Sequence, residues 1–256
     1  NLIIKKLEEL KRDELVDHTF DVVIHCGANA YVGESVEIPG LYLKRNVLST
    51  IKLLDSLNLT EVKKIIFASS CAVYGSAKKE IKEDTIIAPE SPYGWSKYIC
   101  ERILTNYALR YNLDLYVFRF FNVAGANPNF KCGERHDPET HLIPLLFNAA
   151  TNKQNFNVYG NDYNTSDGTC EREYVHISDI VEAHIKAIDL PPSPSIKTIN
   201  LCTGHPYSIL NVISTAETIW NMPINFTFKQ RRNGDAETLF GNYDFANNLL
   251  GWKPTN

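Results

Sequence analysis

The chain has 256 residues, a formal net charge of −4 at pH 7 and 22% charged residues. This length allows one large α/β domain or two smaller lobes with a substantial core. The weak negative charge, without any lysine- or arginine-rich run, gives no electrostatic footprint for nucleic acid. No apolar stretch is long enough to cross a bilayer, so we expect no membrane partner. The charged, amphipathic segment 1–20 has a helical pattern and is not a signal peptide.

The cysteines are spread singly along the chain, and no two of them form a CxxC pair. Several lie in apolar runs, where free cysteine behaves as a small buried hydrophobe. The pattern indicates a reducing, cytoplasmic protein without structural zinc, and we expect no metal site. The six positions are Cys26, Cys71, Cys100, Cys132, Cys170 and Cys202.

Short apolar runs alternate with helical patterns in the first half of the chain. We predict buried strands at 21–26, 63–70 and 114–121, and helices at 41–59 and 91–112. Ser91 fits the cap of the second helix and Pro92 its first residue. Strands that are apolar on both faces and linked by helices predict a parallel sheet covered on both sides. The expected fold class is α/β, with a Rossmann-like, doubly wound sheet.

The character of the sequence changes after residue 122, where a long, polar, turn-rich segment begins. We predict helices at 141–152, 178–190 and 208–220, with strands at 197–202 and 224–228. The predicted domains are a partial Rossmann domain at 1–122 and a smaller lobe at 123–256. We expect the smaller lobe to close over the carboxyl ends of the strands, where open α/β folds place their chemistry, and a segment at about 172–203 to return to the sheet.

Tyr93 and Lys97 lie four residues apart at the start of the helix predicted at 91–112, so they share one helix face. A tyrosine normally titrates near pH ~10, and a neighbouring ammonium favours the phenolate and lowers that pKa. Ser69 and Ser70 end the preceding strand at the same edge of the sheet. A serine hydroxyl of this strand end, together with Tyr93 and Lys97, can take a proton from an alcohol while a hydride leaves its carbon.

Tyr74 and Lys78 have the same spacing as Tyr93 and Lys97. They flank Gly75 and Ser76 at the exit from a strand, where residues i and i+4 need not share a face. Spacing alone therefore does not identify the reactive pair. Its place at a helix start, beside the serines of a strand end, favours Tyr93.

Motifs along nearly the whole chain resemble the extended short-chain dehydrogenase/reductase family, and within it they are most similar to the UDP-glucose (UDP-galactose) 4-epimerases. The motifs, in order, are HCGANAYVGES, SSCAVYG, SPYGWSK, RFFNVAGANP, HDPETHLIP, GNDYNTSDGTCEREYVH and RRNGD. The last three in this order are the most specific. The resemblance implies an NAD-dependent isomerase whose first domain, 1–122, binds NAD.

The resemblance also implies site residues. Tyr93 would be the catalytic base, with Lys97 as its electrostatic partner and Ser70 as the second proton-handling hydroxyl. The implied cofactor contacts are Cys26, Gly27, Ala28, Asn29, Ala30, Asn46, Ser70, Tyr93, Lys97 and Phe121. The implied substrate contacts are Ser70, Tyr93, Asn122, His141, Asn157, Val158, Tyr159, Arg172, the segment Arg232 to Asp235, and Leu239.

A transient oxidation at the sugar C4 is the reaction that the resemblance implies. The hydride would pass to bound NAD and return to the other face of a 4-keto sugar, without net redox change. Leu239 stands where family members differ in residue size, and the resemblance implies that a leucine there favours plain glucose and galactose over N-acetylated sugars. The resemblance also implies a homodimer through the helices predicted at 41–59 and 91–112.

One family motif is missing from the sequence. No glycines fall in the spacing GxGxxG or GxxGxxG, which cradles a dinucleotide pyrophosphate. We expect the chain to be a fragment that lacks roughly sixty residues carrying the first three strands of such a fold. Were it the whole polypeptide, NAD binding would be impaired, and an NAD-deficient sugar-nucleotide-binding or scaffold protein becomes the alternative. Ala30 also stands where some family members have a lysine.

Particular residues and motifs argue for or against other activities of the family. Sugar-nucleotide dehydratases have an acidic pair in place of Cys71 and Ala72, so dehydration is disfavoured. The Ser70-Cys71 pair is similar to that of GDP-sugar epimerase-reductases, but the RRNGD and GNDY segments argue against that activity. A UDP-xylose/arabinose 4-epimerase, or another UDP-sugar 4-epimerase, would have nearly the same motifs and stays an alternative.

Overall fold

The computed structural model describes residues 3–15, 18–77, 79–127, 129, 132–232 and 235–256. Four parallel strands form its central sheet in the order β1-β2-β3-β8. They are β1 (Val22–His25), β2 (Lys64–Ser70), β3 (Asp114–Phe120) and β8 (Ser195–Leu201). All seven residues of β2 are buried, as expected for a strand covered on both faces. The predicted parallel, Rossmann-like α/β fold is confirmed.

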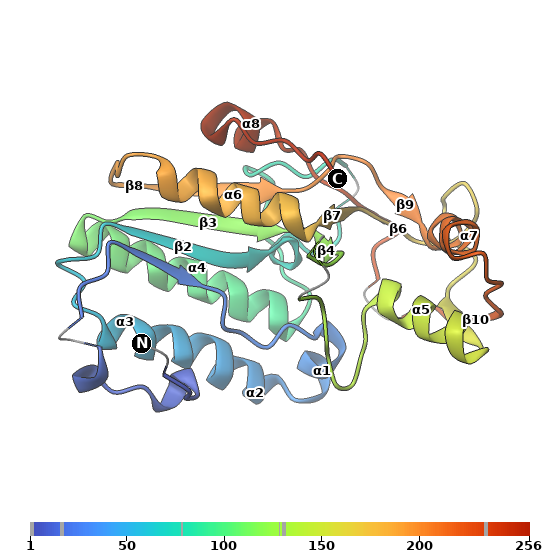
Figure 1. Cartoon of the computed structure of the whole chain (residues 1–256), viewed down its shortest axis with the longest axis horizontal. Coiled ribbons are helices and arrows are strands. Elements are labelled where there is room, and N and C mark those ends of the chain that lie inside the picture. The colour runs from blue at the N-terminus through green and yellow to red at the C-terminus, as the bar shows by residue number, and fades with distance from the viewer. Residues whose placement is uncertain (1–2, 16–17, 78, 128, 130–131, 233–234) are drawn as a thin grey trace.

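Helices cover both faces of the sheet (Figure 1). One face carries α1 (Val32–Glu37), α2 (Pro39–Tyr42), the π-helix η3 (Leu43–Leu48), α3 (Ser49–Ser56) and α4 (Pro92–Tyr111). The other face carries α6 (Ile177–Asp189) and α8 (Asp244–Leu250). In the part of the chain that the structure describes, no helix combines the length and apolar character needed to cross a membrane.

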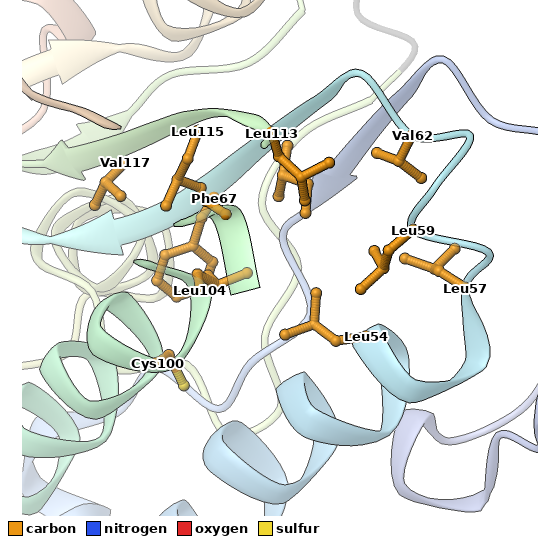
Figure 2. Packing of buried hydrophobic residues seen from close by; sticks show 12 residues of the cluster. Leu54, Leu57, Leu59, Val62, Phe67, Cys100, Leu104, Leu113, Leu115 and Val117 are labelled. Carbon is orange, nitrogen blue, oxygen red and sulfur yellow. The ribbon is translucent and has the colours of Figure 1, made fainter. Parts of the chain in front are cut away.

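A large apolar cluster fixes α3 and α4 to the sheet (Figure 2). Leu54 from α3 and Leu104 from α4 pack with Phe67 of β2 and with Leu115 and Val117 of β3. Each of these side chains is at most 2% exposed. Burying such a side chain stabilises the fold by about 1.5–3 kcal/mol. This cluster therefore holds α4, which carries Tyr93 and Lys97, firmly against β2 and β3.

The opposite face of the sheet has its own core, into which Trp252 inserts from the segment after α8. Its indole Nε1 donates a hydrogen bond to the Asp179 backbone carbonyl at 2.7 Å. Trp252 is fully buried, so this bond satisfies the one polar atom of its side chain. The contact fastens the end of the chain to α6.

The N-terminal segment differs from its predicted helix. Two short 3-10 helices, η1 (Leu7–Glu9) and η2 (Arg12–Glu14), take its place. They are separated by Leu10 and Lys11, both in extended conformation, and Leu10 is 9% exposed. An isolated short helix is marginal in water, so packing against α3 overrides the amphipathic pattern.

The second half of the chain contributes to both lobes. In the smaller lobe, α5 (Leu142–Asn152) and α7 (Ile209–Trp220) pack against a ladder of β5 (Phe156–Tyr159) and β10 (Phe226–Lys229). The short elements are β4 (Asn122–Ala124), β7 (Tyr174–His176), β6 (Glu171–Arg172), β9 (Tyr207–Ser208), β11 (Thr238–Leu239) and η4 (Cys71–Val73). From this half of the chain, β8 is a strand of the central sheet and α6 packs against that sheet. The division into domains at 1–122 and 123–256 stays a prediction.

Candidate functional site

The first turn of α4 lies directly against the end of β2. Ser91 caps the helix, because its Oγ accepts a hydrogen bond from the Gly94 backbone N–H at 3.1 Å, and Pro92 follows as the first helical residue. A Cβ atom added at Gly94 would lie 2.5 Å from the Ala72 carbonyl oxygen, in the segment that leaves β2. Only glycine permits this close approach, which brings Tyr93 to Ser70.

Tyr93 and Ser70 come together at this edge of the sheet. Ser70 is the last residue of β2, and its hydroxyl lies close enough to the Tyr93 phenol to act on the pKa of that phenol. Burial raises the pKa of Tyr93 to about 12, and the Ser70 hydroxyl acts in the opposite direction. Tyr93 is 8% exposed, and with this pKa it stays protonated at neutral pH.

Lys97 lies one turn further along α4. Its ammonium donates a hydrogen bond to the Ala68 backbone carbonyl at 2.6 Å and lies 5.0 Å from the centre of the Phe67 ring. Burial lowers the pKa of Lys97 to about 8. An ammonium has three donors, so two remain for a ligand.

The expected electrostatic effect of Lys97 on Tyr93 is not what the structure shows. Sequence spacing predicted a lowered pKa for the phenol, but the pKa of Tyr93 is raised. The physical reason is that burial dominates, while the ammonium of Lys97 points to the Ala68 carbonyl. Lowering the pKa of Tyr93 would therefore need a positive charge from elsewhere.

Tyr74, the other candidate tyrosine, belongs to the core. It is 2% exposed, and its phenol accepts a hydrogen bond from Arg119 Nη1 and donates one to Asn200 Oδ1, both at 2.8 Å. Lys78, its partner in the sequence pattern, lies outside the described residues. The structure therefore supports Tyr93 over Tyr74 as the reactive tyrosine.

The turn after β1 lies next to this group. Cys26, Gly27, Ala28 and Ala30 are exposed, and Asn29 is half-buried. Partial desolvation by neighbouring atoms raises the pKa of the Cys26 thiol, and the charge of Lys97 acts against this rise, so the turn is within electrostatic range of that ammonium.

Asn46 holds this turn in place. Its Oδ1 accepts from the Asn29 backbone N–H at 2.8 Å, and its Nδ2 donates to the Asn29 carbonyl at 3.0 Å and to Ser96 Oγ at 2.8 Å. Asn46 is 1% exposed and lies in the π-helix η3, a widened turn of the kind common at functional sites. It links the turn to α4, and a direct contact with a cofactor stays a prediction. Ser96 is a residue that the sequence did not reveal.

Two of the predicted ligand residues turn their side chains into the core. Phe121 is 2% exposed and packs with Cys71, Val73 and Cys202. Val158 is 1% exposed and packs in the core of the smaller lobe, because alternate residues of β5 face opposite sides. Only the backbones of these two residues can line a ligand site.

Arg172, Asp235 and Leu239 come together in the structure. The Arg172 guanidinium lies 3.4 Å from the Asp235 carboxylate, and Leu239 pairs with Arg172 in the β6–β11 ladder. Leu239 also packs against the cluster that contains Cys71. Burial raises the pKa of Cys71 to about 12, and the charge of Arg172 acts against this rise. Arg172 and Leu239 are therefore close to Cys71, the residue that follows Ser70.

Tyr159 and Arg232 form a second group. The Arg232 guanidinium lies 4.0 Å from the centre of the Tyr159 ring. Asn157 is exposed two residues earlier on β5. The remaining members of the predicted segment, Asn233 and Gly234, lie outside the described residues.

Asn122 and His141 complete the predicted set. Asn122 is exposed, and its Nδ2 donates to the Glu173 backbone carbonyl at 2.8 Å. His141 is the N-cap residue of α5 and belongs to a group of four exposed or half-buried side chains. The group comprises Glu134, His136, Glu139 and His141, whose possible ligand atoms all lie within 4.8 Å of one another. The imidazoles of His136 and His141 both contact the Glu134 carboxylate, so the histidines and carboxylates of this group are partners of one another. Its repeated Glu-x-His spacing is a signal that the sequence prediction did not use.

Comparison with known proteins gives the family. The NAD dependent epimerase/dehydratase family matches residues 5–202. The chain belongs to this family of enzymes. The UDP-glucose 4-epimerase of Rhizobium meliloti (strain 1021) is 38% identical over 244 residues, which cover 94% of this chain and 74% of that protein. The UDP-glucose 4-epimerase of Lactobacillus helveticus is 39% identical over 243 residues, with the same coverage.

Solved structures agree with this family. The UDP-glucose 4-epimerase from Brucella ovis, in complex with NAD, has a TM-score of 0.87 at 39% identity, covering 92% of this chain and 73% of that one. The enzyme from Bifidobacterium longum, in complex with NAD+ and UDP, has a TM-score of 0.88 at 36% identity, covering 94% of this chain and 73% of that one. The shared fold therefore extends over both lobes.

The buried environment of Lys97 predicts an unusual titration. In the protein labelled with carbon-13 lysine, one side-chain NMR resonance should titrate with a midpoint at about 8. That resonance should be missing in Lys97→Met and present in the control Lys63→Met, whose ammonium is exposed and pairs with Asp21. If every lysine titrates near the ordinary value of ~10.4, the described burial of Lys97 is wrong.

Proposed function

We propose that the protein is a UDP-glucose 4-epimerase, which interconverts UDP-galactose and UDP-glucose through a transient oxidation at C4 with bound NAD. The observation that carries this proposal is the placement of Ser70 beside Tyr93, with Lys97 one turn away, at the carboxyl edge of a parallel sheet. The relatives named UDP-glucose 4-epimerase, which align over more than nine-tenths of the chain, support it.

The residues next to Tyr93 fit a dinucleotide. The exposed turn Cys26–Ala30 offers backbone groups, and Lys97 retains two donors suited to ribose hydroxyls. Bound NAD would supply a hydride acceptor and a positively charged nicotinamide ring. A positive charge next to Tyr93 favours the phenolate, which is the effect that Lys97 alone does not provide.

The proton steps fall to Tyr93 and Ser70. Tyr93 takes the proton of the sugar 4-hydroxyl, and the neighbouring Ser70 hydroxyl orients that group, while the C4 hydrogen leaves as hydride. After the 4-keto sugar has turned over, Tyr93 returns the proton as the hydride comes back to the other face. The result is inversion at C4 without net oxidation.

The nucleotide would be held by the arginines of the smaller lobe. Arg172 and Arg232 offer planar forks that match the oxygens of a diphosphate. Tyr159, already stacked with Arg232, is an aromatic surface for a uracil ring. Leu239, beside Arg172, narrows the sugar site and favours glucose and galactose over N-acetylated sugars.

A second candidate substrate is a UDP-pentose. The UDP-glucose-4-epimerase from Stenotrophomonas maltophila with bound NAD and formylated UDP-arabinopyranose has a TM-score of 0.90 at 30% identity, covering 98% of this chain and 77% of that one. A UDP-xylose/arabinose 4-epimerase would use the same Tyr93 chemistry. Comparing turnover with UDP-galactose and UDP-arabinose separates the two.

The homodimer and the cytoplasmic location stay predictions. Apolar side chains are exposed on the two segments expected to pair, namely Leu43 and Leu48 on η3 and Trp95 and Leu109 on α4. They support association with a second copy of the chain through these helices.

Tyr93→Phe should lower turnover of UDP-galactose by about 10²- to 10⁴-fold, the usual contribution of a general acid–base group. Tyr107→Phe is the matched control on the same helix, because among the described residues its phenol bonds only to Asp55, at 2.9 Å and away from Ser70. Conversion to UDP-glucose, followed without added NADH, is the measurement. Full activity in Tyr93→Phe would remove Tyr93 from the reaction.

Arg232→Ala should weaken UDP binding roughly tenfold or more, because a charge-assisted hydrogen bond contributes about 1.5–3 kcal/mol. Arg231→Ala is the control, since Arg231 pairs with Asp162 and lies over Tyr163 instead. Titration calorimetry with UDP compares the two variants. Equal affinities would contradict the assignment of Arg232.

A further inference from the structure

A buried ion pair joins α4 to β3. The Glu101 carboxylate accepts two hydrogen bonds from Arg119, from Nε to Oε1 at 3.0 Å and from Nη2 to Oε2 at 2.7 Å. Glu101 is 4% exposed and Arg119 is 5% exposed. A bidentate ion pair of this kind requires a defined distance and orientation between its two side chains. The apolar contacts around it are not directional.

Glu101 lies on the same helix face as the proposed catalytic residues. Tyr93, Lys97 and Glu101 follow one another at intervals of four residues, and all three are buried. They belong to one continuous helix of 20 residues, which runs beneath the sheet in Figure 1. A shift of Glu101 along the sheet therefore shifts Tyr93 and Lys97 as well.

The same carboxylate is tied to the end of β2. Ser69 Oγ donates a hydrogen bond to Glu101 Oε1 at 2.5 Å, and Ser69 directly precedes Ser70. One carboxylate thus links the strand that ends in Ser70 to the helix that carries Tyr93.

The network continues across the sheet on the side of Arg119. Its Nη1 donates to the Tyr74 phenol, which in turn donates to Asn200 Oδ1 on β8, both at 2.8 Å. The Arg119 guanidinium also lies 4.7 Å from the centre of the Tyr74 ring. Hydrogen bonds between side chains therefore join β2, β3 and β8 to α4, in addition to the apolar contacts between these elements.

The contribution of the ion pair to the stability of the fold does not by itself explain why two charged side chains are buried between α4 and β3. A buried ion pair is often no more stabilising than apolar residues of similar volume, although removing one partner alone is costly. What the ion pair does specify is the position of α4 relative to β3. We propose that Glu101 and Arg119 are positioning residues that set the place of α4 along the sheet, so that Tyr93 meets Ser70 and Lys97 meets the Ala68 carbonyl. The proposal rests on the function proposed above for Tyr93 and Lys97.

The test replaces both charges together. The double variant Glu101→Leu, Arg119→Met leaves no unpaired buried charge, so it should unfold at a temperature close to that of the native protein. Its turnover of UDP-galactose should fall roughly 10- to 100-fold, the effect of a displacement of ~1 Å at a reactive group. The KM should change less than about threefold, because the proposed nucleotide contacts lie in the smaller lobe.

Thr105→Ala is the matched control one turn further along α4. In the part of the chain that the structure describes, the Thr105 hydroxyl donates only to the Glu101 backbone carbonyl within the helix, at 2.8 Å. This variant should keep native turnover. Native turnover in the folded double variant would overturn the proposal. If the double variant does not fold, Ser69→Ala takes its place, with a smaller loss of turnover expected and native turnover as the contrary result.

A crystal structure of the folded variant separates this proposal from the proposed function. We expect the Lys97 ammonium to leave the Ala68 carbonyl, which it contacts at 2.6 Å in the native protein. An unmoved α4 would overturn the positioning role even if turnover fell. A displaced α4 in a protein whose native form does not convert UDP-galactose would overturn the proposed function and keep the positioning role.

Discussion

The first turn of α4 packs against the segment that leaves β2, and the proposed chemistry depends on that contact. Gly94 makes it possible, because any Cβ there would collide with the Ala72 carbonyl. The contact brings the Tyr93 phenol to the Ser70 hydroxyl. Further along the helix, the apolar cluster around Leu104 and Phe67 keeps α4 on the sheet. The proposed reactive pair is thus a product of helix-to-sheet packing and not of a flexible loop.

Burial moves the two titratable groups of the site toward their neutral forms. It raises the pKa of Tyr93 and lowers that of Lys97, and both shifts follow from the cost of a charge in an apolar surrounding. A phenol in this state is a poor base by itself. The proposed reaction therefore needs a positive charge beside Tyr93 when substrate is bound, and the nicotinamide ring of bound NAD would supply one.

The sequence predicts the sheet well because its strands are apolar on both faces and its helices have clear starts. Ser91 and Pro92 mark the beginning of α4 in both sequence and structure. The predicted N-terminal helix is wrong, since packing of Leu10 outweighs a local pattern. Strands as short as β6 and β11, two residues each, leave no periodic signal to detect.

The candidate site is only partly visible in the sequence. A motif gives the residue types, but not which way each side chain points, as Val158 and Phe121 show by facing the core. The ion pair of Glu101 and Arg119 depends on tertiary contact across residues far apart in the chain. A charged residue inside a strand whose other interior residues are apolar was the signal that could have revealed Arg119.

The central claim is that a hydride leaves C4 and returns to the same carbon within one binding event. It is tested by incubating the protein with UDP-galactose that carries deuterium at C4 and analysing the UDP-glucose by mass spectrometry and NMR. The deuterium should remain at C4, with inverted configuration at that carbon. Loss of deuterium to the solvent, or conversion that moves the label to another carbon, would contradict it.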